Sequence, residues 1–327
     1  CVEVCPMKVR VLKPENPASK CISCGACVYQ CPFGALSDKS FILDAIKMLK
    51  NCDRVYAVVA PAIVSQFTYA KPGQVITAIK ALGFCDVLEA ALGADMVAYT
   101  EAKELTEKGF LTSSCCPAFV DYIEKSFPSL AGHISHNLSP AATISKYIKE
   151  TDPGSRVVFI GPCTAKKAEF QKERVRPYID SVITFEELQA LFDSRDLVIE
   201  SLPETSLDNA SYFGRIFARS GGLTDAVRQA LIERGLDKDF EYRPVSCDGI
   251  EQCRAALFKA SKNVLPNNFI EGMACEGGCV NGPAKISDVR ESVGMRRQLM
   301  LGADDRSIAD NLEMNDFKDI DMKDGRM

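Results

Sequence analysis

The sequence predicts an α/β protein in which a small cysteine-rich domain precedes a large domain of small sheets flanked by helices. Two apolar runs, at 54–60 and 156–160, are typical of buried parallel strands. Segments with helical periodicity lie between these runs and after them. Several strand-like segments also run directly into a loop that carries cysteine. We place the domain boundary after residue 38, so that the two domains span 1–38 and 39–327.

Strands and helices alternate along the large domain. The spacing of apolar residues predicts helices at about 41–49, 74–82, 95–108, 185–192, 224–234 and 249–262. Strands are expected at about 54–60, 86–90, 156–160 and 268–273. The polar and charged stretch 304–327 predicts a surface helix or a frayed end.

Composition narrows the possible functions. Apolar residues make up 46% of the 327 residues and charged residues 25%, as in soluble globular proteins. The net charge is −5 and no block of lysine and arginine stands out, so no nucleic-acid partner is expected. No apolar run approaches the roughly 18 residues of a membrane span. Fifteen cysteines against two histidines favour iron bound by thiolates over zinc or haem.

The first cysteine motif has the spacing of an iron–sulfur site. Cys21, Cys24, Cys27 and Cys31-Pro32 form the Cys-x2-Cys-x2-Cys-x3-Cys-Pro pattern of bacterial 4Fe–4S ferredoxins, whose fourth cysteine serves another cluster. A zinc knuckle is the alternative, and the Cys-Pro ending disfavours it.

Upstream, Cys1 and Cys5-Pro6 match the second half of another such motif, so the sequence is expected to begin inside it. Cys5 would then complete the cluster of Cys21, Cys24 and Cys27. Cys1 and Cys31 would serve a second cluster that this chain ligates incompletely.

A second set of cysteines follows the predicted strands of the large domain. In Cys115-Cys116-Pro117 the adjacent side chains diverge, so one can bind metal while the other is a reactive thiol at a helix N-terminus. Ligands gather at the carboxyl ends of strands in open α/β sheets. We therefore expect a third 4Fe–4S cluster on the cysteines that share this placement: Cys116, Cys163, Cys275 and Cys279.

Three motifs resemble those of the di-iron (FeFe) hydrogenases, and the resemblance spans essentially the whole chain. They are Ser113-Ser114-Cys115-Cys116-Pro117, Pro162-Cys163-x-x-Lys166-x-x-Glu169 and Glu271-x-Met273-Ala-Cys275-x-x-Gly278-Cys279. The resemblance implies a two-lobed catalytic domain and an H-cluster, in which a cysteine thiolate bridges a 4Fe–4S unit to a di-iron centre. That centre carries CO, cyanide and a dithiolate with a bridgehead amine.

The resemblance also assigns roles to individual residues. The four cysteines match the cluster ligands, with Cys279 as the bridging one. Lys166 matches a donor to cyanide, with Glu169 as its partner. The residues that match the walls of the di-iron pocket are Met273, Gly221, Gly222, Ala60 and Pro61.

A proton route is implied as well. Cys115 matches the thiol that exchanges a proton with the bridgehead amine, and Glu101, Ser135 and Glu104 match a relay to solvent. Glu101 and Glu104 are three residues apart, which places them on one face of the predicted helix. The implied function is reversible reduction of protons to H2 in the cytoplasm, with ferredoxin as electron partner and with maturation proteins that build the H-cluster.

Some positions depart from the better-studied members of the family. Gly161 replaces a methionine, Phe119 a tryptophan, Ala62 a serine and Ala141 a glutamine. The expected effect is a looser surrounding of the di-iron pocket. Two alternative functions stay open: an H2 sensor of low turnover and a hydrogenase-like iron–sulfur assembly factor.

The remaining candidates have plainer interpretations. We expect Cys52, Cys85, Cys247 and Cys253 to be buried apolar thiols, of which Cys247 and Cys253 have a spacing that permits a site. His133 and His136 are expected at the surface or at caps, and a role at the proton exit is the less favoured alternative. Lys167 is expected to be surface charge.

Overall fold

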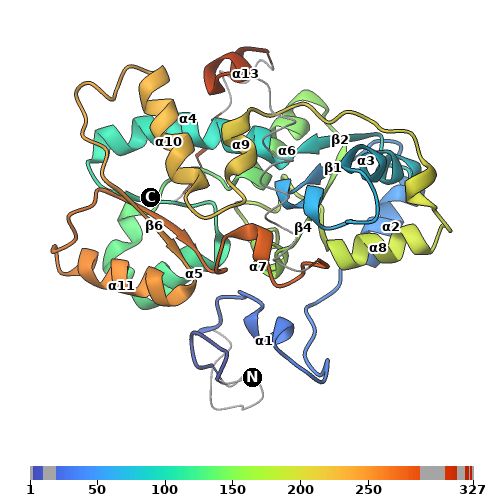
Figure 1. The fold of residues 1–327 in the computed structure, drawn as a ribbon, viewed down its shortest axis with the longest axis horizontal. Helices are drawn as coiled ribbons and strands as arrows, with labels where there is room; N and C mark the ends of the chain where they lie inside the picture. The colour runs from blue at the N-terminus through green and yellow to red at the C-terminus, as the bar shows by residue number, and fades with distance from the viewer. Residues whose placement is uncertain (1–2, 10–19, 288–305, 315–320, 324, 326–327) are drawn as a thin grey trace.

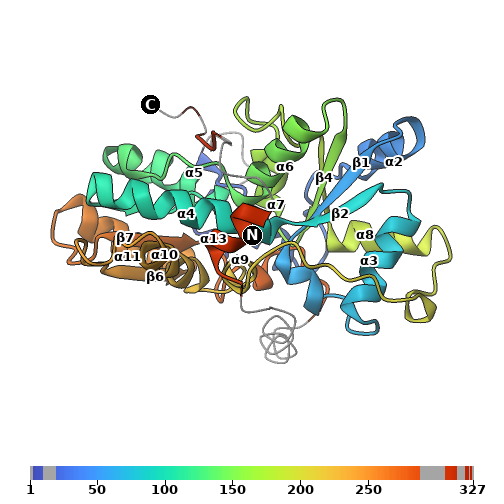
Figure 2. The same cartoon turned by 90° about the horizontal axis from the view of Figure 1, so that it is seen from above.

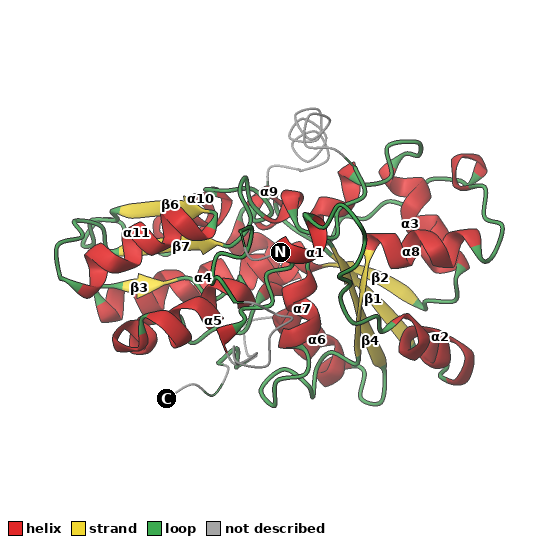
Figure 3. Ribbon diagram, turned by 90° about the horizontal axis from the view of Figure 1, so that it is seen from below, coloured by secondary structure: helices red, strands yellow, loops and turns green. Residues whose placement is uncertain are grey.

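Two parallel sheets form the framework of the molecule. The computed structural model describes residues 3–9, 20–287, 306–314, 321–323 and 325. The first sheet has the order β2-β1-β4-β5 and the second the order β3-β7-β6, with every ladder parallel. The sheets lie in two lobes with helices packed around each (Figures 1 and 3). The predicted α/β architecture of small sheets flanked by helices is confirmed.

The first lobe is built on apolar strands covered by helices. Its strands are β1 (Val55–Val59), β2 (Asp86–Glu89), β4 (Arg156–Gly161) and β5 (Ser181–Thr184). Its helical segments are α2 (Ile42–Asn51), η2 (Pro61–Ser65), α3 (Pro72–Ala81), α6 (Pro140–Thr151), α7 (Thr164–Glu169), α8 (Phe185–Asp193) and η4 (Ile199–Ser201). β1 and β4 are central and almost fully buried, which is why they read as continuous apolar runs.

The second lobe holds the shorter sheet. Its strands are β3 (Leu111–Thr112), β6 (Pro244–Asp248) and β7 (Phe269–Met273). Its helical segments are α4 (Ala90–Lys108), α5 (Pro117–Ser126), η3 (Pro128–His133), α9 (Tyr212–Ile216), α10 (Gly222–Glu233), α11 (Ile250–Ser261) and η5 (Cys279–Asn281). The long helix α4 packs on both α6 and α10, so it joins the lobes (Figure 2).

The N-terminal segment, with its short helix α1 (Ala26–Tyr29), lies near α7 of the first lobe (Figure 1). Gly25 makes this close approach possible. A Cβ on Gly25 would lie 2.3 Å from Thr164 Oγ1 and 2.6 Å from Pro283 Cγ. Thr164 Oγ1 also donates a hydrogen bond to the Ser23 carbonyl at 3.1 Å. The cysteine-rich loop is therefore fastened next to the loop that carries Cys163.

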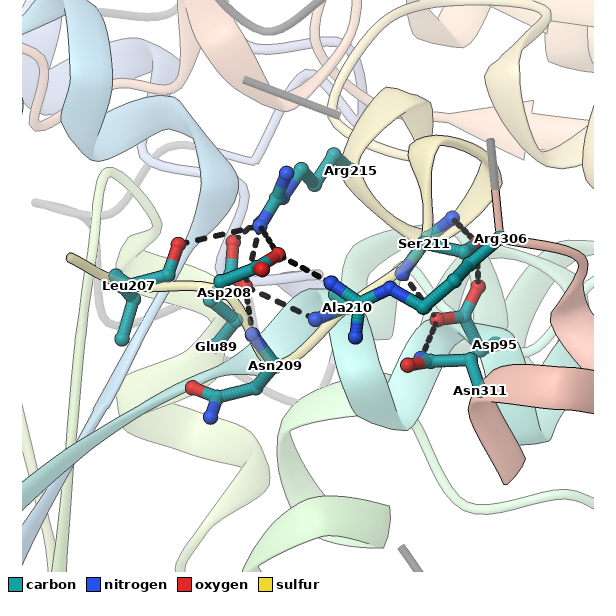
Figure 4. Close-up of polar contacts among 11 residues, drawn as sticks. Glu89, Asp95, Leu207, Asp208, Asn209, Ala210, Ser211, Arg215, Arg306 and Asn311 are labelled. Atoms are coloured by element: carbon teal, nitrogen blue, oxygen red, sulfur yellow. Dashed lines mark hydrogen bonds and ion pairs between the residues drawn. The ribbon is translucent and has the colours of Figure 1, made fainter. Parts of the chain in front are cut away.

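A buried polar network fixes the segment before α9 and the helix α13 (Ile308–Met314) to α4 (Figure 4). Arg215 forms an ion pair with Glu89 at 2.8 Å. Asp95 accepts hydrogen bonds from the Ser211 backbone N–H at 2.8 Å and from Asn311 Nδ2 at 2.7 Å. The helix expected in the tail is present as α13; one face is exposed at Asp310, Glu313 and Met314, and the other is buried through Ile308, Asn311 and Leu312.

Most predicted elements are present, with ends shifted by a few residues. The elements that were missed are the strands β5 and β6, the helix α6 and the short helices α1, α7 and α9. The tail outside 306–314, 321–323 and 325 is not described. In the described parts of the chain, no helix is both long enough and apolar enough to cross a membrane.

Candidate active site

One apolar cavity between the lobes is lined by all the cysteines that follow the strands. Its wall includes Cys115, Cys116, Cys163, Cys275 and Cys279. Ala60 and Pro61 line it from the end of β1, Met273 from the end of β7, and Lys166 from α7. The carboxyl ends of strands from both sheets thus point at a single space, as such sheets commonly do at ligand sites.

Local backbone structure sets where the ligand candidates stand. Cys116 is the N-cap of α5, with Pro117 at the first helical position as predicted. Cys163 is the N-cap of α7. Cys279 begins η5, immediately after Gly278, whose φ of 94° favours glycine. A strand-to-helix turn therefore presents each of Cys116 and Cys163 to the cavity.

Burial favours the protonated form of the cysteines around the cavity. Burial, followed by the charge of Cys116, raises the pKa of Cys163 to about 11. Burial, followed by the charges of Cys163 and Cys279, raises the pKa of Cys275 well above its ordinary value. Burial also raises the pKa of Cys116, while backbone N–H groups of Ala274, Phe119 and Ala118 lower it. A metal bound among these thiols would supply the positive charge that their thiolate forms need.

The donor set matches a cluster more closely than a single ion. Within the residues described, no group of three or more His, Cys, Asp or Glu is placed to hold one metal ion. In a 4Fe–4S cube each thiolate binds a different iron, so the ligands stand farther apart than around one ion. Four cysteines line the cavity, one for each iron of such a cube.

Two further groups have the environment that the resemblance implies. Lys166 is buried, and its Nζ lies 2.6 Å from Glu169 Oε2. Burial lowers the pKa of Lys166, but the charge of Glu169 and its hydrogen bond outweigh this and raise it. Burial raises the pKa of Cys115 well above its ordinary value, and the charges of Cys116, Cys279 and Glu101 add to the shift. Cys115 therefore holds its proton beside the cavity while Lys166 stays charged.

The predicted glycine pair stands behind the cavity wall, at the N-terminus of α10. Phe217 and Ala218 form the wall in this region. Glu271 on β7 accepts hydrogen bonds from the Gly221 N–H at 2.7 Å and from the Thr224 N–H at 2.8 Å. This buried carboxylate thus fixes the start of α10 against the strand that carries Met273. The sequence contained Glu271 in its third motif without indicating this role.

The predicted relay residues lie on the second lobe's side of Cys115. Glu101 is fully buried on α4, and its charge acts on Cys115. Ser135 Oγ donates to Glu104 Oε2 at 3.2 Å. Burial would raise the pKa of Glu104, but hydrogen bonds from Lys108 and the His136 N–H outweigh it and lower that pKa. Glu104 is therefore ionised at neutral pH.

Asn137 and His136 contact the predicted relay residues; the sequence reasoning had offered a role at the proton exit only as the lesser alternative for His136. Asn137 Nδ2 donates to Ser135 Oγ at 2.9 Å, and Ser114 Oγ donates to the Asn137 carbonyl at 2.8 Å. His136 Nδ1 lies 2.6 Å from Glu104 Oε1. The polar run Ser135-His136-Asn137 was the available signal.

The described N-terminal cysteines have two different environments. Burial raises the pKa of Cys24 to about 11, and the charges of Cys21, Cys5 and Cys27 contribute. Cys5 therefore lies with Cys21, Cys24 and Cys27. Cys31 has a different environment, in which backbone N–H groups of Phe33 and Ala35 lower its pKa. Cys1 lies outside the described residues.

The structure contradicts the expectations for Lys167, Cys85 and Cys52 and agrees with those for Cys247, Cys253 and His133. Lys167 is buried and forms ion pairs with Asp38 at 2.5 Å and Glu187 at 2.8 Å, so the prediction of surface charge is wrong. Cys85 is exposed and Cys52 partly exposed, whereas Cys247 and Cys253 are buried as expected. His133 is exposed as expected and packs against Phe110 with ring centroids 5.2 Å apart.

Gly161 does not leave a gap in the pocket. A Cβ at this position would lie 2.9 Å from Cζ of Phe159 and 3.1 Å from Ala60 Cβ. Phe159 is two residues earlier on the same face of β4 and lines the cavity. Its ring occupies the space that a larger residue at 161 would need.

Comparison with known proteins agrees with this geometry. A model of the iron-only hydrogenase large subunit, C-terminal domain, matches residues 53–283, and a 4Fe-4S binding domain matches residues 17–37. The chain is 31% identical over 308 residues to iron hydrogenase 1 of Clostridium pasteurianum, covering 77% of this chain and 53% of that protein. It is 27% identical over 347 residues to the NADP-reducing hydrogenase subunit HndD of Solidesulfovibrio fructosivorans, covering 87% and 59%. The chain thus spans between half and three fifths of the length of these relatives.

Other similarities concern an assembly factor and solved structures. Over 143 residues the chain is 36% identical to the cytosolic Fe-S cluster assembly factor NAR1 of Botryotinia fuckeliana, covering 37% of this chain and 25% of that protein. A structure of [FeFe]-hydrogenase HydA1 from Chlamydomonas reinhardtii superposes with a TM-score of 0.67 at 20% identity, covering 86% of this chain and 94% of the other. At that identity the likeness establishes the fold.

Proposed function

Because the chain belongs to the iron-only hydrogenase large-subunit family, we propose that it interconverts protons, electrons and H2 at an H-cluster. The ligands would be Cys116, Cys163, Cys275 and Cys279, with Cys279 as the bridge to the di-iron unit. The observation that carries the proposal is the single cavity lined by these four cysteines together with Cys115 and Lys166. When bound, the di-iron unit with its CO, cyanide and dithiolate ligands would supply an open metal site and an amine base.

Electrons would enter through the N-terminal domain. Cys24 is close enough to Cys275 for its charge to raise the pKa of that thiol. Ile22 belongs to the same apolar core as Cys116, and Met7 and Cys24 pack against that core. A 4Fe–4S cluster on Cys5, Cys21, Cys24 and Cys27 would therefore stand next to the catalytic cube. Cys1 and Cys31 would contribute to a second cluster, and the donor would be a ferredoxin or a similar carrier.

The chain's own side chains would manage the protons and the anionic ligands. Cys115 holds a proton at the cavity wall, where it can be given up and recovered. Glu101, Ser135 and Glu104 would relay protons between Cys115 and solvent. Lys166, kept charged by Glu169, would donate to cyanide. The apolar residues around the cavity would exclude bulk water, which strengthens these interactions.

Infrared spectroscopy of the anaerobically matured full chain, with an H2 assay using reduced ferredoxin, tests the proposal. CO and cyanide bands together with turnover are expected. Cys279→Ser should lose the bands, whereas Cys247→Ser, which alters a buried thiol that does not line the cavity, should keep them. Wild-type protein that shows no bands after correct maturation would exclude the di-iron unit.

Two alternative functions have specific support. The identity with NAR1 supports an iron–sulfur assembly factor. Such a factor has no use for Cys115 or for the Lys166–Glu169 pair, so we rank it second. The departures at Ala62 and Ala141 support an H2 sensor, for which bands without appreciable turnover are expected.

Partners and location are proposed on weaker similarity. Maturation proteins would be needed to build the di-iron unit. We propose a cytoplasmic location. The names of the relatives include both compartments: a periplasmic [Fe] hydrogenase large subunit of Nitratidesulfovibrio vulgaris and cytosolic assembly factors. Cell fractionation followed by immunoblotting separates the two compartments.

A further inference from the structure

A histidine stands at the solvent end of the proposed relay. His136 Nδ1 lies 2.6 Å from Glu104 Oε1 and 2.8 Å from Lys108 Nζ. Lys108 Nζ is in turn 2.9 Å from Glu104 Oε1. The His136 backbone N–H also donates to both Glu104 oxygens, at 3.1 and 3.2 Å. The carboxylate and the imidazole are therefore held in one fixed geometry.

This junction opens on a hollow of about 800 Å³ between α4, α10 and α13. The side chain of His136 is 28% exposed and that of Glu104 is 15% exposed. The charged groups that share the hollow are Lys103, Glu107 and Lys108 from α4, Arg234 next to α10, Glu313 from α13, and Asp321 and Lys323. Water in the hollow thus reaches the imidazole more readily than the carboxylate behind it.

One ring nitrogen cannot donate to Glu104 and accept from Lys108 at the same time, so the junction has two arrangements of its protons. With hydrogen on Nδ1, the ring donates to Glu104. With hydrogen on Nε2 only, Nδ1 accepts from Lys108. Imidazole is the side chain best suited to move between such states near neutral pH.

We propose that His136 exchanges protons between water in the hollow and the Glu104 carboxylate, an inference that rests on the proposed function. Water or a buffer acid protonates Nε2, and the Nδ1 proton passes to Glu104, which becomes a carboxylic acid. The ring is then neutral with hydrogen on Nε2. It returns to its starting form when Nε2 loses its proton to water and Nδ1 regains one through Lys108, which solvent recharges. Each cycle delivers one proton inward.

The chain offers a matched control, because His133 is its other histidine and lies on η3 away from the junction. His136→Ala in the matured full chain is expected to slow H2 evolution by about tenfold, most strongly at the alkaline side of the pH profile. Added imidazole should restore most of the loss. His133→Ala should change neither the rate nor the profile. Equal rates for His136→Ala and wild type, or a loss that imidazole does not restore, would overturn the proposal.

A second measurement does not depend on turnover. With ¹⁵N-histidine labelling, the two imidazoles are distinguished by the His133→Ala variant. The Nδ1 signal of His136 should show a hydrogen bond that Glu104→Gln alters. An unchanged signal would overturn the assigned contact, even if infrared bands confirm the H-cluster. Conversely, absent bands with an altered signal would remove the hydrogenase function and leave the contact.

Discussion

The contact between Phe159 and Gly161 predicts how far substitutions at the two positions lower the free energy of unfolding, and the packing sets the magnitude. Phe159 is only 4% exposed, and Phe→Ala changes at such sites cost about 3–5 kcal/mol. Gly161→Met places a Cβ 2.9 Å from the Phe159 ring, and such overpacking costs about 1–3 kcal/mol. If the two changes were independent, the double variant would lose roughly 6 kcal/mol in free energy of unfolding. Since the methionine would enter the space that the ring leaves, we expect a loss of only about 3 kcal/mol.

Anaerobic guanidinium unfolding followed by circular dichroism measures this coupling. Phe192→Ala combined with Gly161→Met serves as control, because Phe192 lies on α8 and does not line the cavity. That pair should be additive. In the matured protein, the CO bands of Phe159→Ala should also shift, and Gly161→Met should move them back. Additive losses within about 0.5 kcal/mol for the Phe159 pair would refute the idea that its ring fills the place of residue 161.

Three further predictions concern single groups. Cys115→Ala should keep the infrared bands and lose nearly all turnover, and unchanged turnover would remove Cys115 from the mechanism. Lys166→Met should lower the free energy of unfolding by about 3 kcal/mol, because it leaves the Glu169 carboxylate buried without its cation. Adding Glu169→Gln to this variant should recover part of the loss. Guanidinium unfolding measures both changes. Burial raises the pKa of Asp95 from 3.8 to about 7 against the hydrogen bonds from Ser211 and Asn311, so the folded state binds this proton more tightly than the unfolded state. The stability from Asp95 should thus be greatest below about pH 4, fall up to about pH 7 and stay level above it. Hydrogen-exchange protection factors in α13, which remove the base-catalysed intrinsic rate, should be lower at about pH 8 than at about pH 5.5, and in Asp95→Asn they should be the same at both.

Much of the fold could be predicted because its signals are local. β1 and β4 are buried on both faces, so their sequences contain continuous apolar runs. β6 was missed because Pro244, Ser246 and Asp248 interrupt its pattern, and only pairing with β7 makes it a strand. The burial of α13 also depends on partners far away in sequence, since Asn311 is held by Asp95.

In the site, too, features with a local sequence signal could be predicted, and features that depend on distant contacts could not. Cysteine spacing and the order of the motifs indicated which residues gather around the cavity. Lys167 was misjudged because a lysine in sequence carries no sign of the two distant carboxylates, Asp38 and Glu187, that permit its burial. His136 was undervalued because its contact with Glu104 spans 32 residues. The sequence did not indicate a role for Phe159, because its packing over Gly161 is evident only in the three-dimensional structure.

Anomalous diffraction at the iron edge, from crystals of the matured chain grown without oxygen, tests the central claim most directly. The expected map has a cube of iron bonded to Cys116, Cys163, Cys275 and Cys279, with a further two-iron peak beyond Cys279 and next to Cys115. Iron density absent from this cavity, or any of the four sulfurs turned away from the cube, would contradict the assignment.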